Sequence, residues 1–149
     1  MSATNTFETN LLALITKNTA CPNVGDSTGL AGSAVAGSLF VSLTTASSGE
    51  TGDQDTSEIS YTSYARVTVS RTPGDGSGWT VSGNTADNAA AITFATATGG
   101  TTTAVAFGVG SDVSGAGNLH LYGSLTSSLV VSNGITPQFA VGALDITLD

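Results

Sequence analysis

Charged side chains are scarce in this 149-residue sequence, where they make up 9% of the residues against about a quarter in an average globular protein. Cations are the scarcest, because only Lys17, Arg66 and Arg71 oppose eleven acidic residues, and the net charge is −8. Without a basic stripe to neutralise phosphates, direct nucleic-acid binding is disfavoured. The acidity also disfavours anionic membranes and suits a protein that stays soluble at high copy number.

Cysteine and histidine occur once each, as Cys21 and His120. A lone cysteine cannot form an intrachain disulfide, and the two residues cannot supply the three or four ligands of a zinc site. Cys21 precedes Pro22 and lies away from the helix N-terminus or cation that activates a thiolate, so we expect a buried structural thiol. For His120, in a predicted strand without a nucleophile-elbow motif, we expect a solvent-facing or interface side chain and no catalytic role.

Long apolar runs are also missing. None approaches the roughly 18 residues that a membrane-spanning helix needs, and no basic segment followed by an apolar run opens the chain. We therefore expect a soluble protein made in a cytoplasm. Disorder is excluded, because the sequence is 40% hydrophobic with a mean hydropathy of +0.22 and its apolar residues fall in short regular runs.

Four carboxylates lie within nine residues, at Glu50, Asp53, Asp55 and Glu58. Such a cluster is of interest for a hard cation, but a calcium-binding EF-hand loop needs Gly at its sixth and Glu at its twelfth position. Counted from Asp53, these positions hold Glu58 and Tyr64. We expect an exposed acidic loop, with a weak cation site as the alternative, and we predict no metal, no cofactor and no catalytic residues.

The apolar spacing changes once along the chain. Phe7, Leu11, Leu14 and Ile15 predict a helix over 6–16 with Thr6 as N-cap. A loop rich in Gly, Ala and Ser follows, and from Leu39 onward the period is two, which is typical of half-buried strands. The predicted strands cover residues 39–44, 65–70, 79–82, 91–94, 105–109, 118–125, 129–131 and 145–148.

Turn residues separate these strands, and Asn133-Gly134 is the strongest signal for a type I′ hairpin. Short strands with turns at spacings near ten residues favour an all-β fold, an antiparallel β-sandwich or jelly roll with a short N-terminal α-helix. We predict a single domain over 1–149, with the helix region in 1–20, a flexible loop at 22–38 and the sandwich in 39–149.

Aromatic residues number nine, too few for the lined groove of a typical glycan-cleaving site. Phe94 and Phe107 alternate toward the predicted core. Tyr61, Tyr64 and Trp79 follow turn-rich segments and are candidates for a subunit contact, or alternatively for a local core. The helix, with Phe7 and Leu11, and the segment 25–37 are expected near a subunit or capsid contact.

The order of these segments resembles a family of small tailed-bacteriophage virion proteins, known as phage tail fibre proteins and also found among capsid-decorating subunits. None of the segments is a catalytic signature, and it is their order and spacing that carry the resemblance. The similar segments are Phe7–Ile15, Leu39–Ala46, Gly49–Gly52, Tyr64–Val69, Ile92–Gly99, Phe107–Gly110, Asn118–Leu125 and Phe139–Leu148.

This resemblance implies a β-sandwich component of a virion, used in many copies and without an active site. The chain departs from the family in a longer Pro22–Gly37 stretch and in Ser47-Ser48, where Asp-Pro is common. We expect a capsid decoration or cement protein, a homotrimer bound to the major capsid protein or another virion protein. The alternative is a tail or fibre component that contacts the host surface. An enzyme or a cellular adhesin is less favoured.

Overall fold

The computed structural model describes residues 3–148, which form two compact units. The helix unit comprises residues 3–38, Val69–Ile92 and residues 139–148. The sheet unit comprises Leu39–Thr68 and Thr93–Gln138. That the chain acts as a single domain stays a prediction.

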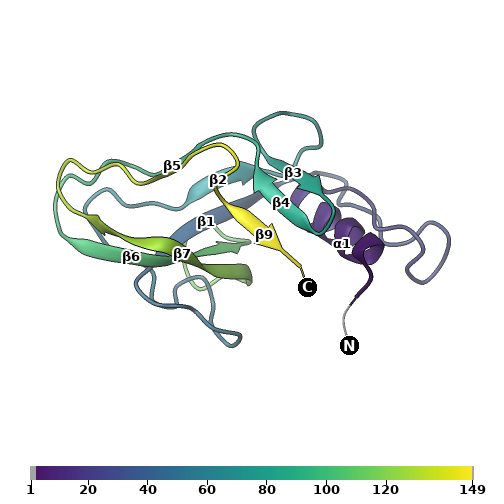
Figure 1. Ribbon diagram of the computed structural model, residues 1–149, viewed down its shortest axis with the longest axis horizontal. Coiled ribbons are helices and arrows are strands. Elements are labelled where there is room, and N and C mark those ends of the chain that lie inside the picture. The colour runs from purple at the N-terminus through teal and green to yellow at the C-terminus, as the bar shows by residue number, and fades with distance from the viewer. Residues whose placement is uncertain (1–2, 149) are drawn as a thin grey trace. The chain divides into compact units, whose positions relative to one another are not determined.

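The predicted fold class is confirmed: the chain is mostly β, its sheets are antiparallel, and one short α-helix lies near the N-terminus (Figure 1). Three sheets have the strand orders β2-β1-β6-β7, β3-β4-β9 and β5-β8. The elements are α1 (Asn5–Lys17), β1 (Ser38–Thr44), β2 (Val67–Ser70), β3 (Trp79–Ser82), β4 (Thr85–Asn88), β5 (Ile92–Thr93), β6 (Thr102–Gly110), β7 (Leu119–Val131), β8 (Gln138–Phe139) and β9 (Asp145–Thr147).

Helix α1 begins earlier than predicted. Its N-cap is Thr4 rather than Thr6, because the Thr4 side chain accepts a hydrogen bond from the backbone N–H of Phe7. The buried residues of the helix are Glu8, Leu12 and Thr16, whereas Phe7 is 42% exposed. Apolar residues at 11, 12, 14 and 15 cover a broad arc, and contacts with β3 and β4 decide which part of it is buried.

Strands β3 and β4 form a two-residue hairpin in which Ser82 pairs with Thr85. Gly83 occupies the first turn position with φ +60, the conformation that a type II′ turn requires there. Strand β4, which the sequence analysis missed, lies between β3 and β9. Its buried residues Ala86 and Asn88 alternate with half-buried neighbours.

In the sheet unit, strand β6 is central and both of its faces are covered from Ala106 to Gly110. On one face, Val41 and Leu43 of β1 lie opposite Val109 and Phe107. Phe107 in turn lies over Gly123 of β7, where a Cβ would come within 2.8 Å of its ring. The interior of this sheet thus depends on glycine where the phenylalanine ring packs.

Irregular segments of the sheet unit hydrogen-bond to one another. Phe94 N–H donates to the carbonyl of Pro137, and Ala97 N–H to that of Ile135. The predicted burial of Phe94 and Phe107 is confirmed. The predicted type I′ hairpin at Asn133-Gly134 is wrong, because only Gly134 of the pair has positive φ and the turn joins β7 to β8, which belong to different sheets.

The loop between α1 and β1 is held by hydrogen bonds between its own residues. Cys21 is fully buried, as predicted, and exchanges two backbone hydrogen bonds with Leu30. The Asn18 side chain donates to the carbonyl of Ser33 and accepts from its N–H. Flexibility of residues 22–38 stays a prediction, but these contacts limit where a motion can occur.

Candidate functional site

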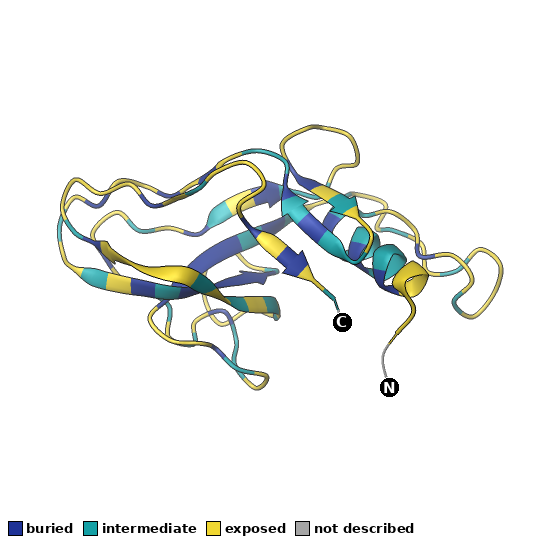
Figure 2. Ribbon diagram, viewed as in Figure 1, coloured by how far each residue is buried: buried dark blue, intermediate teal, exposed yellow. Residues whose placement is uncertain are grey.

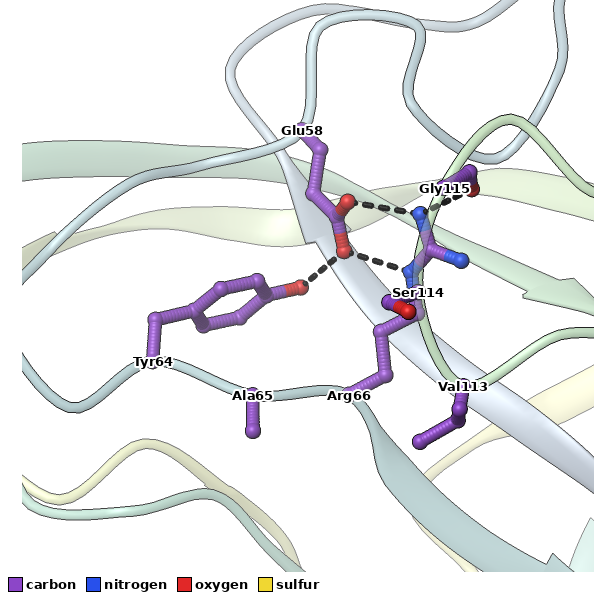
Figure 3. Close-up of a pocket in the computed structure, with 7 residues that line it drawn as sticks. All are labelled: Glu58, Tyr64, Ala65, Arg66, Val113, Ser114 and Gly115. Carbon is purple, nitrogen blue, oxygen red and sulfur yellow. Dashed lines mark hydrogen bonds and ion pairs between the residues drawn. The ribbon is translucent and has the colours of Figure 1, made fainter.

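Arg66 lies just before β2 and is the centre of the most extensive polar cluster in the sheet unit. Its side chain is 2% exposed and its guanidinium forms a two-bond fork with Glu58, from Nε at 2.8 Å and from Nη2 at 2.7 Å (Figure 3). Nη2 also contacts Asp55 at 2.8 Å. Bidentate pairs of this kind are the strong form of the arginine–carboxylate interaction.

Two backbone carbonyls complete the surroundings of this guanidinium. Nη1 donates to Asp112 at 2.9 Å and Nη2 to Gly115 at 2.9 Å. Arg66 therefore binds residues of the acidic loop, 50–58, and of the β6–β7 loop, 111–118. The hydrogen bond to Glu58 raises the pKa of Arg66 further, so its charge is permanent.

Tyr64 extends the cluster toward the core. Its hydroxyl donates to Glu58 at 2.7 Å and accepts from the backbone N–H of Leu43 at 3.2 Å. Its ring stacks on Phe94 at a centroid distance of 6.2 Å. Burial, and next the hydrogen bond to Glu58, raise the pKa of Tyr64, so the phenol stays protonated.

Gln54 makes a second connection between the same two loops. Its side chain is 1% exposed, accepts from Asp112 N–H at 2.8 Å and donates to Asp112 C=O at 3.3 Å. Its backbone N–H donates to Ala116 at 2.7 Å. A Cβ at Gly110 or Gly117 would collide with Gln54, so both glycines are needed for this packing.

A shallow depression of about 220 Å³ lies over the Arg66 cluster, with Val113, Ser114 and Gly115 along one side. Figure 3 shows the guanidinium turned toward Glu58 and Gly115. With one cation against two carboxylates, the cluster has a formal charge of −1 and no spare cation for an anionic ligand. Its arrangement fastens loops and places no nucleophile beside a general base.

Arg71, in the helix unit, is bound by carbonyl groups alone. Its Nε donates to Ile15 at 2.6 Å, Nη2 to Leu14 at 2.8 Å and Nη1 to Ala36 at 2.9 Å. Leu14 and Ile15 are among the last carbonyls of α1, which lack partners within the helix and attract cations. Arg71 thereby joins the end of α1 to the loop that precedes β1.

Most carboxylates of the acidic loop bind other groups of the sheet unit. Asp55 and Glu58 bind Arg66, and Asp53 accepts from Asp55 N–H and from the Thr56 hydroxyl. Residues 3–148 hold no group of three or more His, Cys, Asp or Glu side chains placed to bind a metal ion. This loop is therefore not the plain solvent-exposed acidic loop of the prediction, because an arginine organises it.

His120 lies in β7 at a register irregularity, because Val109 pairs with Leu121 and Gly110 with Leu119. It is the extra residue of this bulge and is exposed, which agrees with the solvent-facing alternative of the sequence analysis. Within residues 3–148 its side chain makes no hydrogen bond to a serine or carboxylate, the contacts that a catalytic triad requires.

The five residues predicted for a subunit contact lie in different surroundings. Phe7 is 42% exposed and Leu11 is half-buried on α1. Tyr61 and Trp79 are buried in their own units, and Tyr64 belongs to the Arg66 cluster. The structure thus brings Tyr61 and Tyr64 together, with ring centroids 5.3 Å apart, and their role in an interface stays a prediction.

Comparison with known proteins gives one family. The model of the family described as podophage GP4 fiber I protein gp80 matches residues 2–147. The chain belongs to this family. The predicted resemblance to small tailed-phage virion proteins with a tail fibre role is thereby confirmed, whereas no curated protein matches the chain.

In this member of the gp80 fiber I family, the polar clusters hold loops and a helix end together. No helix within the described residues is long and apolar enough to cross a membrane. The sequence analysis missed Arg66, Gln54 and Arg71 as organising residues. The scarcity of cations was the signal that could have pointed to the two arginines. In a chain with three cations, an arginine at the start of a predicted strand is a candidate for a specific contact.

Proposed function

We propose that the protein is a structural subunit of a phage fibre, without catalytic activity, that assembles with copies of itself and with another virion protein and contacts the host surface. The observation that carries this proposal is the family match over residues 2–147, because the family is that of a podophage fiber protein. The fibre role, the alternative in the sequence analysis, is the better supported reading. Capsid decoration is the competing outcome of the test.

The distribution of charge supports a binding and building role. Arg66 and Arg71 have their guanidinium groups engaged within their own units, which leaves Lys17 as the remaining cation of the chain. The exposed surface is thus made mainly of hydroxyl-bearing, small and acidic side chains. Such a surface repels anionic membranes and nucleic acid, and contacts partners through neutral hydrogen bonds and packing.

The fastened loops supply a fixed surface of the sheet unit. Arg66 and Gln54 hold the acidic loop and the β6–β7 loop together, while Val113 stays 60% exposed. Binding residues are disproportionately found on loops held by a rigid scaffold. A loop that is already ordered loses less conformational entropy on binding. We propose this loop pair as the part of the subunit that contacts the host surface.

Locating the protein on the virion tests the fibre role. Cryo-electron microscopy of intact particles, combined with quantitative mass spectrometry, is expected to show the density in fibres and a copy number of a few to a few dozen. Density on the head shell at far higher copy number would favour capsid decoration instead. In that case particles without the protein should release DNA more readily on heating or osmotic challenge.

Host contact needs its own test. Particles that carry Val113→Asp together with Ser114→Asp are expected to adsorb more slowly, because added carboxylates at the loop tip repel an anionic cell surface. A matched control, Ala34→Asp together with Val35→Asp, adds the same charges at two adjacent exposed positions in a loop of the helix unit. Equal adsorption by both variants would contradict host contact through the loop pair and leave the fibre location intact.

A further inference from the structure

Strand β7 is an edge strand of the four-stranded sheet and is paired with β6 on one side only. It is 13 residues long, about twice the usual length of a strand. Residues 126–130 are exposed without interruption, as the yellow part of this strand in Figure 2 shows. An open edge presents unpaired backbone N–H and C=O groups to any further strand.

The edge lacks the usual protection by charge. Residues 119–131 contain no Asp, Glu, Lys, Arg or Pro, although the chain as a whole carries a net charge of −8. Charged side chains and proline are the common means by which proteins keep an edge strand from pairing. All acidic residues of the sheet unit lie instead in two loops, at Glu50, Asp53, Asp55, Glu58 and Asp112.

Bulges in β7 determine which side chains share a face. Opposite Ala104, Ala106 and Gly108 of β6, which alternate onto one face, lie Leu129, Ser124 and Tyr122. The extra residues between Ser124 and Leu129 form the second irregularity of the strand. Tyr122 and Leu129 therefore lie on the same face despite their odd spacing, and they are 42% and 38% exposed.

The strand is self-complementary in the antiparallel direction. Ser124 lies opposite Ala106, midway between the partners of Tyr122 and Leu129, so two copies paired about a two-fold axis at Ser124 place Tyr122 opposite Leu129 of the second copy. The same register places Leu121 opposite Val130 of the second copy. A two-fold axis perpendicular to the sheet requires paired residues to share a face, and the bulge makes both pairs meet this condition.

Charge favours a second copy over a basic partner. Copies with a net charge of −8 repel each other over most of their surface, so a contact between them is least opposed along a strip without charge. A basic partner would gain no attraction there. We propose that β7 is a self-association edge, through which two copies pair antiparallel and join their four-stranded sheets.

This proposal deepens the fibre role and rests on it only for the use of the contact in the particle. The pairing is measured on the purified full chain by sedimentation over a wide range of protein concentration. The average mass is expected to rise from 14.6 kDa toward twice that value. A protein that stays monomeric at every concentration, or forms a trimer that β7 variants leave unchanged, would overturn the proposal.

Charge placement gives the decisive variants. Tyr122→Glu together with Leu129→Glu puts like charges opposite each other in both symmetric pairs, and is expected to give a monomer. The control, Val35→Glu together with Val141→Glu, adds the same charge at positions 80% and 66% exposed in the helix unit and should still dimerise. Loss of the dimer in both variants would mean that net charge, rather than the β7 edge, controls association.

A compensating variant separates loss of pairing from loss of folding. Tyr122→Lys together with Leu129→Glu is as polar as the monomeric variant but puts opposite charges across the contact, so it should restore the dimer in a salt-sensitive way. Failure to restore it, with native circular dichroism, would contradict the proposed register. Whether the protein lies on the head or in a fibre is determined separately, on virions. The fibre role and the β7 self-association edge can therefore fail independently of each other.

Discussion

Arg66 in the sheet unit and Arg71 in the helix unit each hold separate segments of the chain together, but they bind different groups. Arg66 binds two carboxylates and two carbonyls and is almost fully buried, whereas Arg71 binds three carbonyls and is half-buried. A buried cation needs opposite charge because desolvation is costly. A cation at a helix C-terminus needs only the unpaired carbonyls and the helix dipole.

The comparison shows how a cation-poor chain uses its cations. Each arginine joins segments that are distant in sequence, across up to 49 residues for Arg66 and 57 for Arg71. Both guanidinium groups bind segments of the chain itself. Because the two environments differ in burial and in opposite charge, the same substitution should cost different amounts in the two units.

Arg66→Met is expected to have the largest effect on stability, a loss of about 3–5 kcal/mol in the free energy of unfolding, as for removal of one partner of a buried ion pair. The cause is that Glu58 remains mostly buried without its partner while two loops lose their connection. Urea unfolding followed by circular dichroism measures it. Arg66→Lys keeps the charge but not the two-bond fork, so its free energy of unfolding should lie between those of the unmodified protein and Arg66→Met.

Arg71→Met is expected to cost less, about 1.5–3 kcal/mol, the range for hydrogen bonds to charged groups. The carbonyls of Leu14 and Ile15 lie at a helix end, where water can replace part of what the guanidinium supplies. Hydrogen exchange should increase in the last turn of α1 and in residues 30–38. A loss larger than that of Arg66→Met would reverse the comparison and show that burial with opposite charge is not what matters.

Gln54→Leu sharpens the comparison by removing a neutral fastening from the same loops that Arg66 holds. Asp112 N–H would lose its partner, while Asp112 C=O would keep the hydrogen bond from Arg66, which predicts a loss of about 1–3 kcal/mol. The measurement is urea unfolding, with Gln54→Glu as control because it retains the acceptor for Asp112 N–H. If Gln54→Leu proved neutral, the charged cluster alone would hold the loop pair.

How far the sequence predicts this molecule depends on the distance over which each signal acts. Two-residue alternation is local, and it located β1, β3, most of β6 and β9. Strand β4 escaped because Ala, Asp and Asn are depleted in strands, although the Gly83-Asn84 pair marked its hairpin. Residues 118–125 and 129–131 were predicted as two strands and form one, since bulged residues keep the strand continuous.

The candidate site was harder to predict than the fold. Glu58 lies eight residues before Arg66 and was noticed as part of an acidic loop. The other partners of Arg66, in the β6–β7 loop, lie 46 and 49 residues away from it. No local pattern encodes such a contact. The buried face of α1 is also set by distant contacts, because strands β3 and β4 select among several apolar residues of the helix.

A pair of carboxylates in the helix unit gives the smallest predicted effect on stability. Unlike the arginines, which attract their partners, these two groups carry like charges. Asp87 of β4 lies opposite Asp145 of β9, and a hydrogen bond with Asp145 followed by burial raises the pKa of Asp87. Since its folded-state pKa is raised, this group contributes stability below its unfolded pKa and loses that contribution as pH rises. At neutral pH two like charges then face each other, which is destabilising.

Asp87→Asn should therefore raise the melting temperature at neutral pH, by an amount corresponding to about 0.5 kcal/mol, and the gain should vanish in acid. Asp75→Asn is the matched control, because hydrogen bonds from Ser70 and then from Ser77 N–H lower the pKa of Asp75. Its carboxylate stabilises the fold above its unfolded pKa, so this substitution should be destabilising at neutral pH. Equal shifts in both variants would mean that total charge, and not the Asp87–Asp145 register, sets the pH dependence.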